Sequence, residues 1–234
     1  METILLHEVY SDIIRFLTKE NQNLFFNERD LQMHLALYLQ KLNKYDDVEV
    51  EYYVPVFDTN KNKILQGYDW DSEVKLDIVV VKNNEFLPVE IKYKTKRTTK
   101  SFIFKRFNKE IPNVNILKNQ SAQDLGCYDF WKDVRRIEVI KGQYEETVKC
   151  GIALFLTNDS YYWGGRIKEN SACYNFRLSE NNKTLKKEWN NDVKSKLTHL
   201  DFKLDRAYNS KWINIKDFQD CPKEEFKCYL VKVF

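Results

Sequence analysis

The chain has 234 residues, of which 43% are hydrophobic and 15% are aromatic. This composition is rich enough to build one sizeable core, so a disordered chain is excluded as the default. The 38 lysine and arginine residues exceed the 35 acids by only 3, so total charge alone indicates neither a nucleic-acid nor a membrane partner.

The cysteines and the N-terminal sequence bear on the cell compartment. Five widely spaced cysteines without a CxxC pair favour neither a disulfide framework nor a zinc cluster. Residues 1–20 contain Glu2, Glu8 and Asp12 and no continuous apolar stretch, which argues against a secretion signal. No segment reaches the about 18 unbroken apolar residues of a membrane span. We therefore expect a soluble, cytoplasmic protein with no membrane partner.

Apolar spacing and turn residues predict the elements in chain order. Helices are expected over residues 3–19, from about Asn27, from about Ser121 and near Thr184–Leu197. Ser121 and Asp124 are placed to form a start resembling a capping box for the third of these helices. Strands are expected within 48–57, in both halves of 75–94, within 147–159 and within 226–234. This order indicates a single α/β domain whose mixed sheet is covered by helices.

The two strands within residues 75–94 are expected to form a hairpin. Asn83 and Asn84 separate two apolar runs, and asparagine tolerates the positive φ angles of a two-residue hairpin loop. In that register Lys82 pairs with Glu85.

The same register places two acids opposite each other inside the sheet. Asp77 then faces Glu90, and directly opposed carboxylates destabilise a sheet unless a positive charge lies between them. Oxygen ligands suit Mg²⁺ or Mn²⁺, so both acids are candidate metal ligands. Lys92 lies two residues beyond Glu90, hence on the same face, and adds an ammonium group. One small patch is therefore expected to combine two metal-binding acids and a cation.

A third acid lies on the second predicted helix. Glu28 stands three residues before Leu31 and extends an apolar stripe, which consists of Leu31, Leu35, Tyr38 and Leu42. If this helix packs on the sheet, Glu28 points at the same patch. The alternative is that Glu28 only interacts with the positive end of the helix dipole.

These residues resemble the motif of the PD-(D/E)XK nuclease superfamily, which has a restriction-endonuclease-like fold. The motif combines an acid on an early helix, an aspartate on one strand and (D/E)xK on the adjoining strand, here Glu28, Asp77 and Glu90-Ile91-Lys92. The resemblance covers about residues 27–157 and implies a mixed sheet of four to five strands flanked by helices. Residues 160–234 would be a C-terminal elaboration of this single domain. The proline that often precedes the family's aspartate is replaced by Leu76.

The resemblance also implies roles for individual residues. Asp77, Glu90 and the backbone carbonyl of Ile91 would bind Mg²⁺ or Mn²⁺, with Glu28 acting directly or through water. Lys92 would orient the attacking water and stabilise charge on the scissile phosphate. Auxiliary polar residues on the following helix would be Gln120, Gln123 and Asp124.

A competing interpretation of residues 90–94 remains open. The sequence EIKYK also suits the outer face of an edge strand, with Glu90 and Lys92 in solvent and Asp77 paired to a lysine.

The segment after the motif bears on the substrate. Residues 92–109 hold eight basic side chains and no acid, with aromatic residues between them. Such a segment beside a metal site suits a phosphate backbone, although charge runs are usually only solvated. The predicted nucleic-acid contacts are Lys94, Lys96, Arg97, Lys100, Lys105 and Arg106. Trp163 is a candidate for lining the same cleft, with a core role as the alternative.

Two functions follow as expectations. The first is a divalent-metal-dependent nuclease that hydrolyses phosphodiester bonds in DNA, in restriction, repair or defence. Many such enzymes cut two strands as dimers, which makes a homodimer one candidate assembly. The second is a catalytically inactive module of the same fold that binds nucleic acid or a partner protein.

Overall fold

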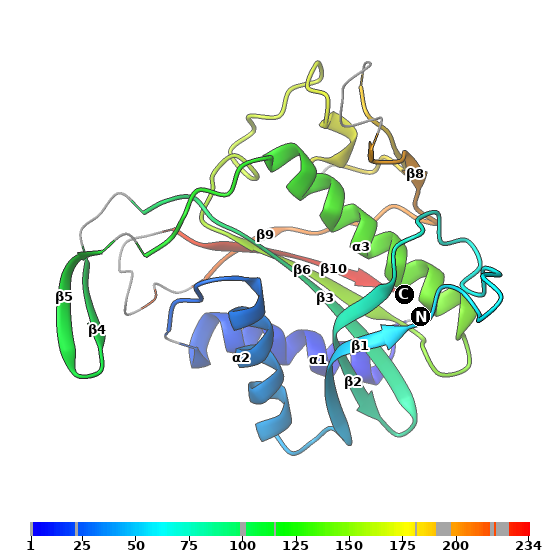
Figure 1. Cartoon of the computed structure of the whole chain (residues 1–234), viewed down its shortest axis with the longest axis horizontal. Helices are drawn as coiled ribbons and strands as arrows, with labels where there is room; N and C mark the ends of the chain where they lie inside the picture. The colour runs from blue at the N-terminus through cyan, green and yellow to red at the C-terminus, as the bar shows by residue number, and fades with distance from the viewer. Residues whose placement is uncertain are drawn as a thin grey trace.

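A six-stranded mixed sheet forms the centre of the molecule (Figure 1). The computed structural model describes residues 2–21, 23–98, 102–114, 116–180, 182–190, 198–215, 218 and 225–234. The strand order is β1-β2-β3-β6-β10-β9, in which β3 and β6 are parallel and the other neighbours are antiparallel. The strands are β1 (Asp47–Val54), β2 (Val74–Lys82), β3 (Glu85–Lys94), β6 (Gly151–Thr157), β10 (Lys227–Val233) and β9 (Trp212–Asn214).

The expected number of four to five strands is wrong. The strand expected within 226–234 is present as β10, which pairs with β6 along its whole length, and the short β9 adds a sixth strand at the edge. Part of residues 160–234 therefore belongs to the central sheet. The α/β class and the mixed strand directions are confirmed.

Helices cover both faces of the sheet (Figure 1). α1 (Ile4–Arg15), which continues into the π-helical turn η1 (Phe16–Glu20), and α2 (Glu28–Lys41) pack on one face. α3 (Gln123–Gln143) packs on the other. Each face has its own buried apolar cluster, so the sheet is the middle layer of three.

The helix starts differ in how they are capped. Thr3 and Asn27 accept backbone N–H bonds from Leu6 and Asp30 at 3.1 and 2.8 Å, as N-cap residues do. The predicted start of α3 is wrong in detail. Its N-cap is Ala122 with φ of 61° and no side-chain bond, so Ser121 stands one residue too early to form a capping box with Asp124.

The predicted asparagine hairpin is present. Lys82 pairs with Glu85, and Asn83 and Asn84 have φ angles of 51° and 61°. Both angles suit a two-residue hairpin turn that matches the twist of its strands.

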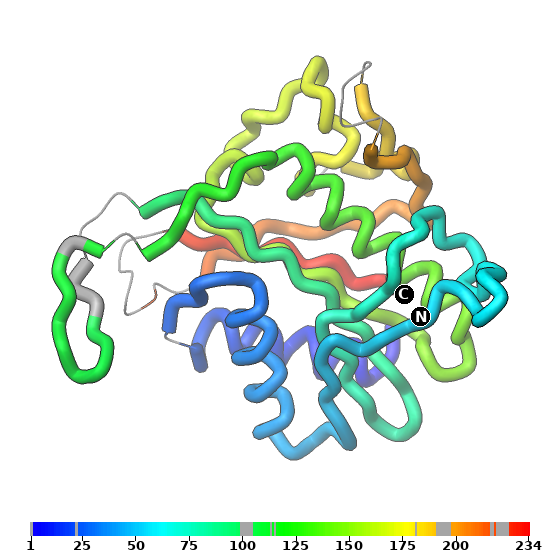
Figure 2. The backbone as a smooth tube through the Cα atoms, in the orientation of Figure 1, coloured from blue at the N-terminus to red at the C-terminus, as the bar shows by residue number. Residues whose placement is uncertain are grey.

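A second hairpin, which the sequence did not indicate, projects from the body of the molecule (Figures 1 and 2). It consists of β4 (Phe102–Arg106) and β5 (Lys109–Val114). Its turn residues Phe107 and Asn108 also have positive φ, at 50° and 61°. Phe107 is 98% exposed at the tip.

The prediction of a helix near Thr184–Leu197 is wrong for residues 184–190, the described part of that segment. Residues 184–190 contain the short strand β7 (Lys186–Lys187), which pairs with β8 (Phe202–Lys203), while residues 191–197 lie outside the described residues. Buried Lys187 and Trp189 alternate with more exposed neighbours, which is the period of extended chain. The 3₁₀ turn η2 (Tyr174–Phe176) packs beside this segment.

The cysteines of the described residues are not cross-linked. Cys127, Cys150, Cys173 and Cys228 are free and buried, whereas Cys221 lies outside the described residues. Among the helices that the structure describes, none is both long and apolar enough to cross a bilayer.

Candidate active site

The two strands that carry the motif separate at the motif itself. β2 and β3 are paired from Lys82↔Glu85 to Ile78↔Val89. Beyond that point β3 stays paired with β6 as far as Lys94, while β2 stays paired with β1 as far as Val74. We call the opening between residues 74–77 and 90–94 the fork. The predicted hairpin register is confirmed from Lys82↔Glu85 to Ile78↔Val89. Asp77 and Glu90 come next in that register and lie where the two strands separate.

Carboxylates from two elements occupy the open side of β3. The backbone N–H of Ile91 donates to Asp77 Oδ2 at 2.6 Å, and the N–H of Tyr93 donates to Glu28 Oε2 at 2.8 Å. The N–H of Asp77 in turn lies 3.4 Å from Glu90 Oε2. In an unbroken sheet, backbone carbonyls would accept such N–H groups. α2 and β2 thus bring Glu28 and Asp77 to the fork, beside Glu90 of β3.

The backbone of β2 is irregular at Asp77. Leu76 packs in the cluster on the α3 side, but Ile78 packs on the α1 and α2 side, so the alternation of faces breaks between them. On the neighbouring strand Glu51 has φ of 53°. The Gln32 side chain of α2 donates to the Asp77 carbonyl at 2.7 Å and to Glu51 Oε1 at 3.2 Å. Irregular backbone of this kind costs free energy and clusters at functional sites.

Lys92 lies among three oxygen atoms. Its Nζ is 3.0 Å from Asp133 Oδ2, 3.7 Å from Glu28 Oε1 and 3.2 Å from the Ile91 carbonyl that it donates to. Lys92 and Glu28 side chains keep 18% and 39% of their surface exposed, so this part of the fork is open to solvent.

Glu90 lies deeper and is only 1% exposed. Its Oε1 is 2.5 Å from Arg136 Nη1, which also lies 3.2 Å from Asp133 Oδ1. The edge-strand interpretation of residues 90–94 is therefore wrong, since β3 is an inner strand and Glu90 is buried and ion-paired.

Asp133 and Arg136 of α3 were not predicted from the sequence. A signal was present, because Asp133 stands three residues after Phe130 and four before Ile137, two buried apolar residues. An acid on the apolar stripe of a helix is the same pattern that identified Glu28.

Four acids surround two basic side chains at the fork. In the part of the chain that the structure describes, Lys92 and Arg136 form ion pairs with Glu28, Glu90 and Asp133, and Asp77 lies beside them. Burial, reinforced by the neighbouring Glu90, raises the pKa of Asp77 to about 9. Burial also raises the pKa of Glu90, and Arg136 opposes that rise only in part. Burial lowers the pKa of Lys92, but the nearby Asp133 and Glu28 outweigh it and raise the pKa overall.

The donor set fits a hard divalent cation held by few protein ligands. Among the described residues, no three histidine, cysteine or acidic side chains converge as a dedicated metal cage. Mg²⁺ is usually held by one or two carboxylates and completes its shell with water and substrate phosphate. Asp77 and Glu90 supply such a pair, and a cation bound between them would take the place of the proton that burial otherwise keeps on Asp77.

No family model, curated protein or solved structure matches this chain. Any functional assignment therefore depends on the residues and geometry of the fork and its surroundings.

The predicted nucleic-acid contacts lie in two groups. Lys94 is the last residue of the fork, and Lys96 and Arg97 follow it. The side-chain amides of Asn158 and Asn119 hold this segment, because they accept the backbone N–H groups of Lys96 and Arg97, each at 2.7 Å. Lys105 and Arg106 lie on the projecting hairpin, and Lys100 lies outside the described residues.

The predicted auxiliary residues of α3 have other contacts. Gln123 Nε2 lies 3.4 Å from Asp159 Oδ2, and the Gln120 N–H donates to the Thr95 carbonyl at 2.9 Å. Asp124 lies in the first turn of α3, two to three turns before Asp133 and Arg136. Those two residues form the ion pairs that join α3 to the motif. Trp163 lines a separate cavity.

Proposed function

We propose that the protein is a divalent-metal-dependent nuclease of the PD-(D/E)XK type, with DNA as its substrate. The observation that carries this proposal is the fork, where Glu28, Asp77, Glu90 and Lys92 meet although they come from α2, β2 and β3. All four positions of the motif hold residues competent for the chemistry.

Each side chain has a role in this proposal. Asp77 and Glu90 would hold the cation, which when bound polarises a phosphoryl oxygen and lowers the pKa of a bound water. Lys92 offsets the negative charge that develops on the phosphate during attack. Glu28, which is partly exposed and 3.7 Å from Lys92 Nζ, holds the ammonium group at the open side of the fork.

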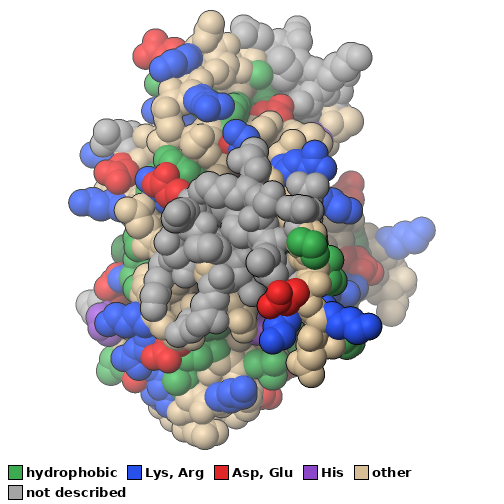
Figure 3. Space-filling model, turned by 90° about the vertical axis from the view of Figure 1, so that its left-hand side faces the viewer, with side chains coloured by type: hydrophobic (Ala, Val, Ile, Leu, Met, Phe, Trp, Pro, Cys, Tyr) green, Lys and Arg blue, Asp and Glu red, His purple; other side chains and the backbone are tan. Residues whose placement is uncertain are grey.

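The basic residues near the fork favour a polyanionic substrate. Lys96 and Arg97 are exposed immediately after β3, and Lys105, Arg106 and Lys109 are exposed on the projecting hairpin. Figure 3 views the molecule from the hairpin end. Lysine and arginine side chains lie around the grey area that is not described, with acidic side chains between several of them. Basic side chains beside a hydrolytic site suit a phosphate backbone.

A second candidate function is supported by the ion pairs themselves. Arg136 binds Glu90 and Asp133 binds Lys92, so a purely structural network would make the same contacts. In that case the protein would be an inactive module that binds nucleic acid or a partner protein.

Cleavage assays separate the two functions. Plasmid, linear duplex, single-stranded DNA and RNA are incubated with Mg²⁺ or Mn²⁺ and the wild-type protein. We expect metal-dependent cleavage of DNA that falls at least about 100-fold in Asp77→Asn and in Lys92→Met. Lys203→Met, which changes an exposed lysine of the two-stranded sheet β7–β8, is the matched control and should cleave normally.

Folding is checked for each variant by its thermal melt. Cleavage that persists in folded Asp77→Asn would remove the fork as the catalytic site. Binding without cleavage by the wild type would favour the inactive module. If one copy carries one fork, single-strand nicks before linear plasmid indicate independent copies, whereas direct linearisation indicates a homodimer.

A further inference from the structure

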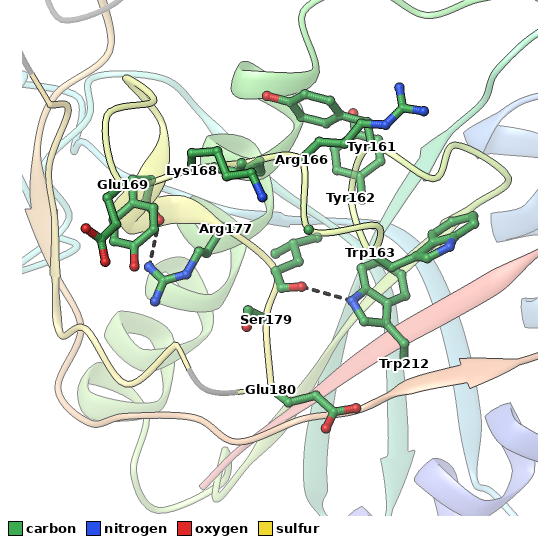
Figure 4. A pocket seen from close by; sticks show the side chains of 14 residues that line it. Tyr161, Tyr162, Trp163, Arg166, Lys168, Glu169, Arg177, Ser179, Glu180 and Trp212 are labelled. Carbon is green, nitrogen blue, oxygen red and sulfur yellow. Dashed lines mark hydrogen bonds between the residues drawn. The ribbon is translucent and has the colours of Figure 1, made fainter.

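A cavity of ≈ 530 Å³ lies beyond the C-terminal end of β6 (Figure 4). We call it the aromatic pocket and define it by its principal side chains, which are Tyr161, Trp163, Arg166, Lys168, Arg177 and Trp212. Its volume falls within the range of about 300–1,000 Å³ typical of small-molecule sites. None of these residues contributes to the ion pairs of the fork.

One side of the aromatic pocket is made of indole rings. Trp163 and Trp212 meet edge to face with their ring centroids 5.6 Å apart. Trp212 Nε1 donates to the Leu178 carbonyl at 2.9 Å, which fixes the orientation of that indole (Figure 4). Both side chains are only half-buried, so this side offers aromatic surface to a planar ligand.

The opposite side carries two basic side chains, Lys168 and Arg177, with Glu169 beside them (Figure 4). The Arg177 guanidinium lies 3.8 Å from the Tyr174 ring centroid and donates to the Tyr174 carbonyl at 2.9 Å, so it is held in place. Lys168 stands on the same side of the aromatic pocket (Figure 4). Three basic side chains line the cavity against two acids, Glu169 and Glu180. A ligand with a planar aromatic part and an anionic part would satisfy both sides.

The aromatic pocket opens at the same end of the sheet as the fork. Lys94 of β3 pairs with Thr157 of β6, and Tyr161 follows only four residues later. A Cβ atom on Gly126 of α3 would lie 2.6 Å from the Tyr162 hydroxyl and 3.4 Å from Lys94 Cε, so these two side chains converge on one helical turn. The Asn158 side chain also donates to the Lys96 carbonyl at 3.0 Å. The basic residues after the fork therefore adjoin the wall of the aromatic pocket.

We propose that the aromatic pocket binds one unstacked nucleotide, with its base against Trp163 and Trp212 and its phosphate toward Lys168 and Arg177. That this nucleotide belongs to the cleaved strand rests on the proposed nuclease function. Aromatic side chains beside a basic track are how proteins hold single-stranded nucleic acid, because every base offers a face for stacking.

The proposal is tested with deoxyadenosine monophosphate, added to metal-free protein that carries Asp77→Asn so that no cleavage interferes. Ligand-observed NMR gives its dissociation constant and that of inorganic phosphate. We expect the monophosphate to bind more tightly than phosphate and Trp163→Ala to weaken it about 5- to 150-fold. Lys168→Ala, which changes an exposed side chain that folding does not need, should also weaken it.

Tyr53→Ala is the matched control, since Tyr53 is an aromatic residue 51% exposed on β1, and it should leave the affinity unchanged. Equal affinity for the monophosphate and for phosphate, or wild-type affinity in Trp163→Ala, would overturn the proposal. The titration involves no cleavage, so the two proposals can fail separately. If the wild type and Trp163→Ala cut DNA equally well, the proposal that the aromatic pocket holds a nucleotide of the cleaved strand is refuted and the nuclease proposal is not. If the wild type never cuts DNA but Trp163→Ala weakens nucleotide binding, the nuclease proposal is refuted and nucleotide binding in the aromatic pocket is not.

Discussion

Asp77 links the stability of the protein to its proposed chemistry. It is half-buried beside Glu90, and its pKa is raised to about 9, so without a cation the side chain holds a proton at neutral pH. A carboxyl group with a raised pKa lowers the free energy of unfolding at neutral pH, relative to its contribution at low pH. Functional sites commonly carry such a cost.

We expect metal-free Asp77→Asn to be more stable than the wild type above pH 4. Between the ordinary pKa of 3.8 and the folded-state value of about 9, only the folded state binds this proton. The contribution of Asp77 to the free energy of unfolding therefore falls as pH rises through that window. Asparagine lacks this dependence, so the variant gains in relative stability as the pH rises towards 9, where Asp77 ionises beside Glu90 and their repulsion is worth about 1 kcal/mol, or about 2–4 °C in Tm. Thermal melts from pH 4 to 9 should show a widening gap, and a constant gap would contradict the raised pKa.

Lys187 gives a pH dependence of the opposite sign. It is fully buried, its Nζ lies 3.9 Å from the Trp131 ring centroid, and it donates to the Asn175 carbonyl. Burial, with Arg177 nearby, lowers its pKa from 10.5 to about 7. Between these values only the unfolded state binds the proton, so the contribution of Lys187 to the free energy of unfolding rises with pH.

Urea unfolding of Lys187→Met at several pH values tests this assignment. We expect the difference in unfolding free energy between wild type and variant to shift in favour of the wild type from pH 7 to 10. Lys183→Met, which changes an exposed lysine of the same segment, is the control and should leave the pH dependence unchanged. Parallel curves for Lys187→Met and the wild type would show that Lys187 keeps its charge in the folded protein.

The β4–β5 hairpin is the element most exposed to a substrate. At its turn end it contacts the segment before α2, where the Arg106 guanidinium lies 5.1 Å from the Phe26 ring centroid. Lys105 and Lys109 are exposed on its two strands, and Phe107 at its tip is almost fully exposed. Such a basic, projecting hairpin suits contact with the phosphates of a duplex.

Charge reversal on the hairpin should weaken DNA binding without unfolding the protein. For Lys105→Glu combined with Lys109→Glu we expect lower duplex affinity and a salt dependence whose slope is shallower by about 1 for each phosphate that the variant no longer neutralises. Lys203→Glu, an exposed lysine of the other two-stranded sheet, is the matched control. Fluorescence anisotropy at several salt concentrations measures both quantities. An unchanged slope would place the DNA elsewhere on the surface.

Local patterns predicted some elements of this fold well. The apolar stripe located α2, and the two asparagines set the register that brings Asp77 and Glu90 together. These features depend on neighbouring residues alone. The β4–β5 hairpin was missed because its turn holds Phe107, a residue that rarely adopts positive φ.

The parts that tertiary packing decides could not be predicted in this way. Arg136 meets Glu90 only because α3 crosses β3, and no local pattern specifies that crossing. Lys187 looks like a surface residue in sequence, yet it is buried because a carbonyl and an indole ring enclose its ammonium group. The sixth strand likewise depends on residues 212–214 returning to β10.

At the scale of the whole molecule, three layers converge on the fork: α2 supplies Glu28, the sheet supplies Asp77, Glu90 and Lys92, and α3 supplies their partners. The central claim is that this convergence creates a site for a divalent cation. Anomalous diffraction from crystals soaked in millimolar MnCl₂ tests it most directly. We predict an anomalous peak between the carboxylates of Asp77 and Glu90 in the wild type and no such peak in Asp77→Asn. Manganese bound only elsewhere, or an equal peak at the fork in Asp77→Asn, would contradict the assignment.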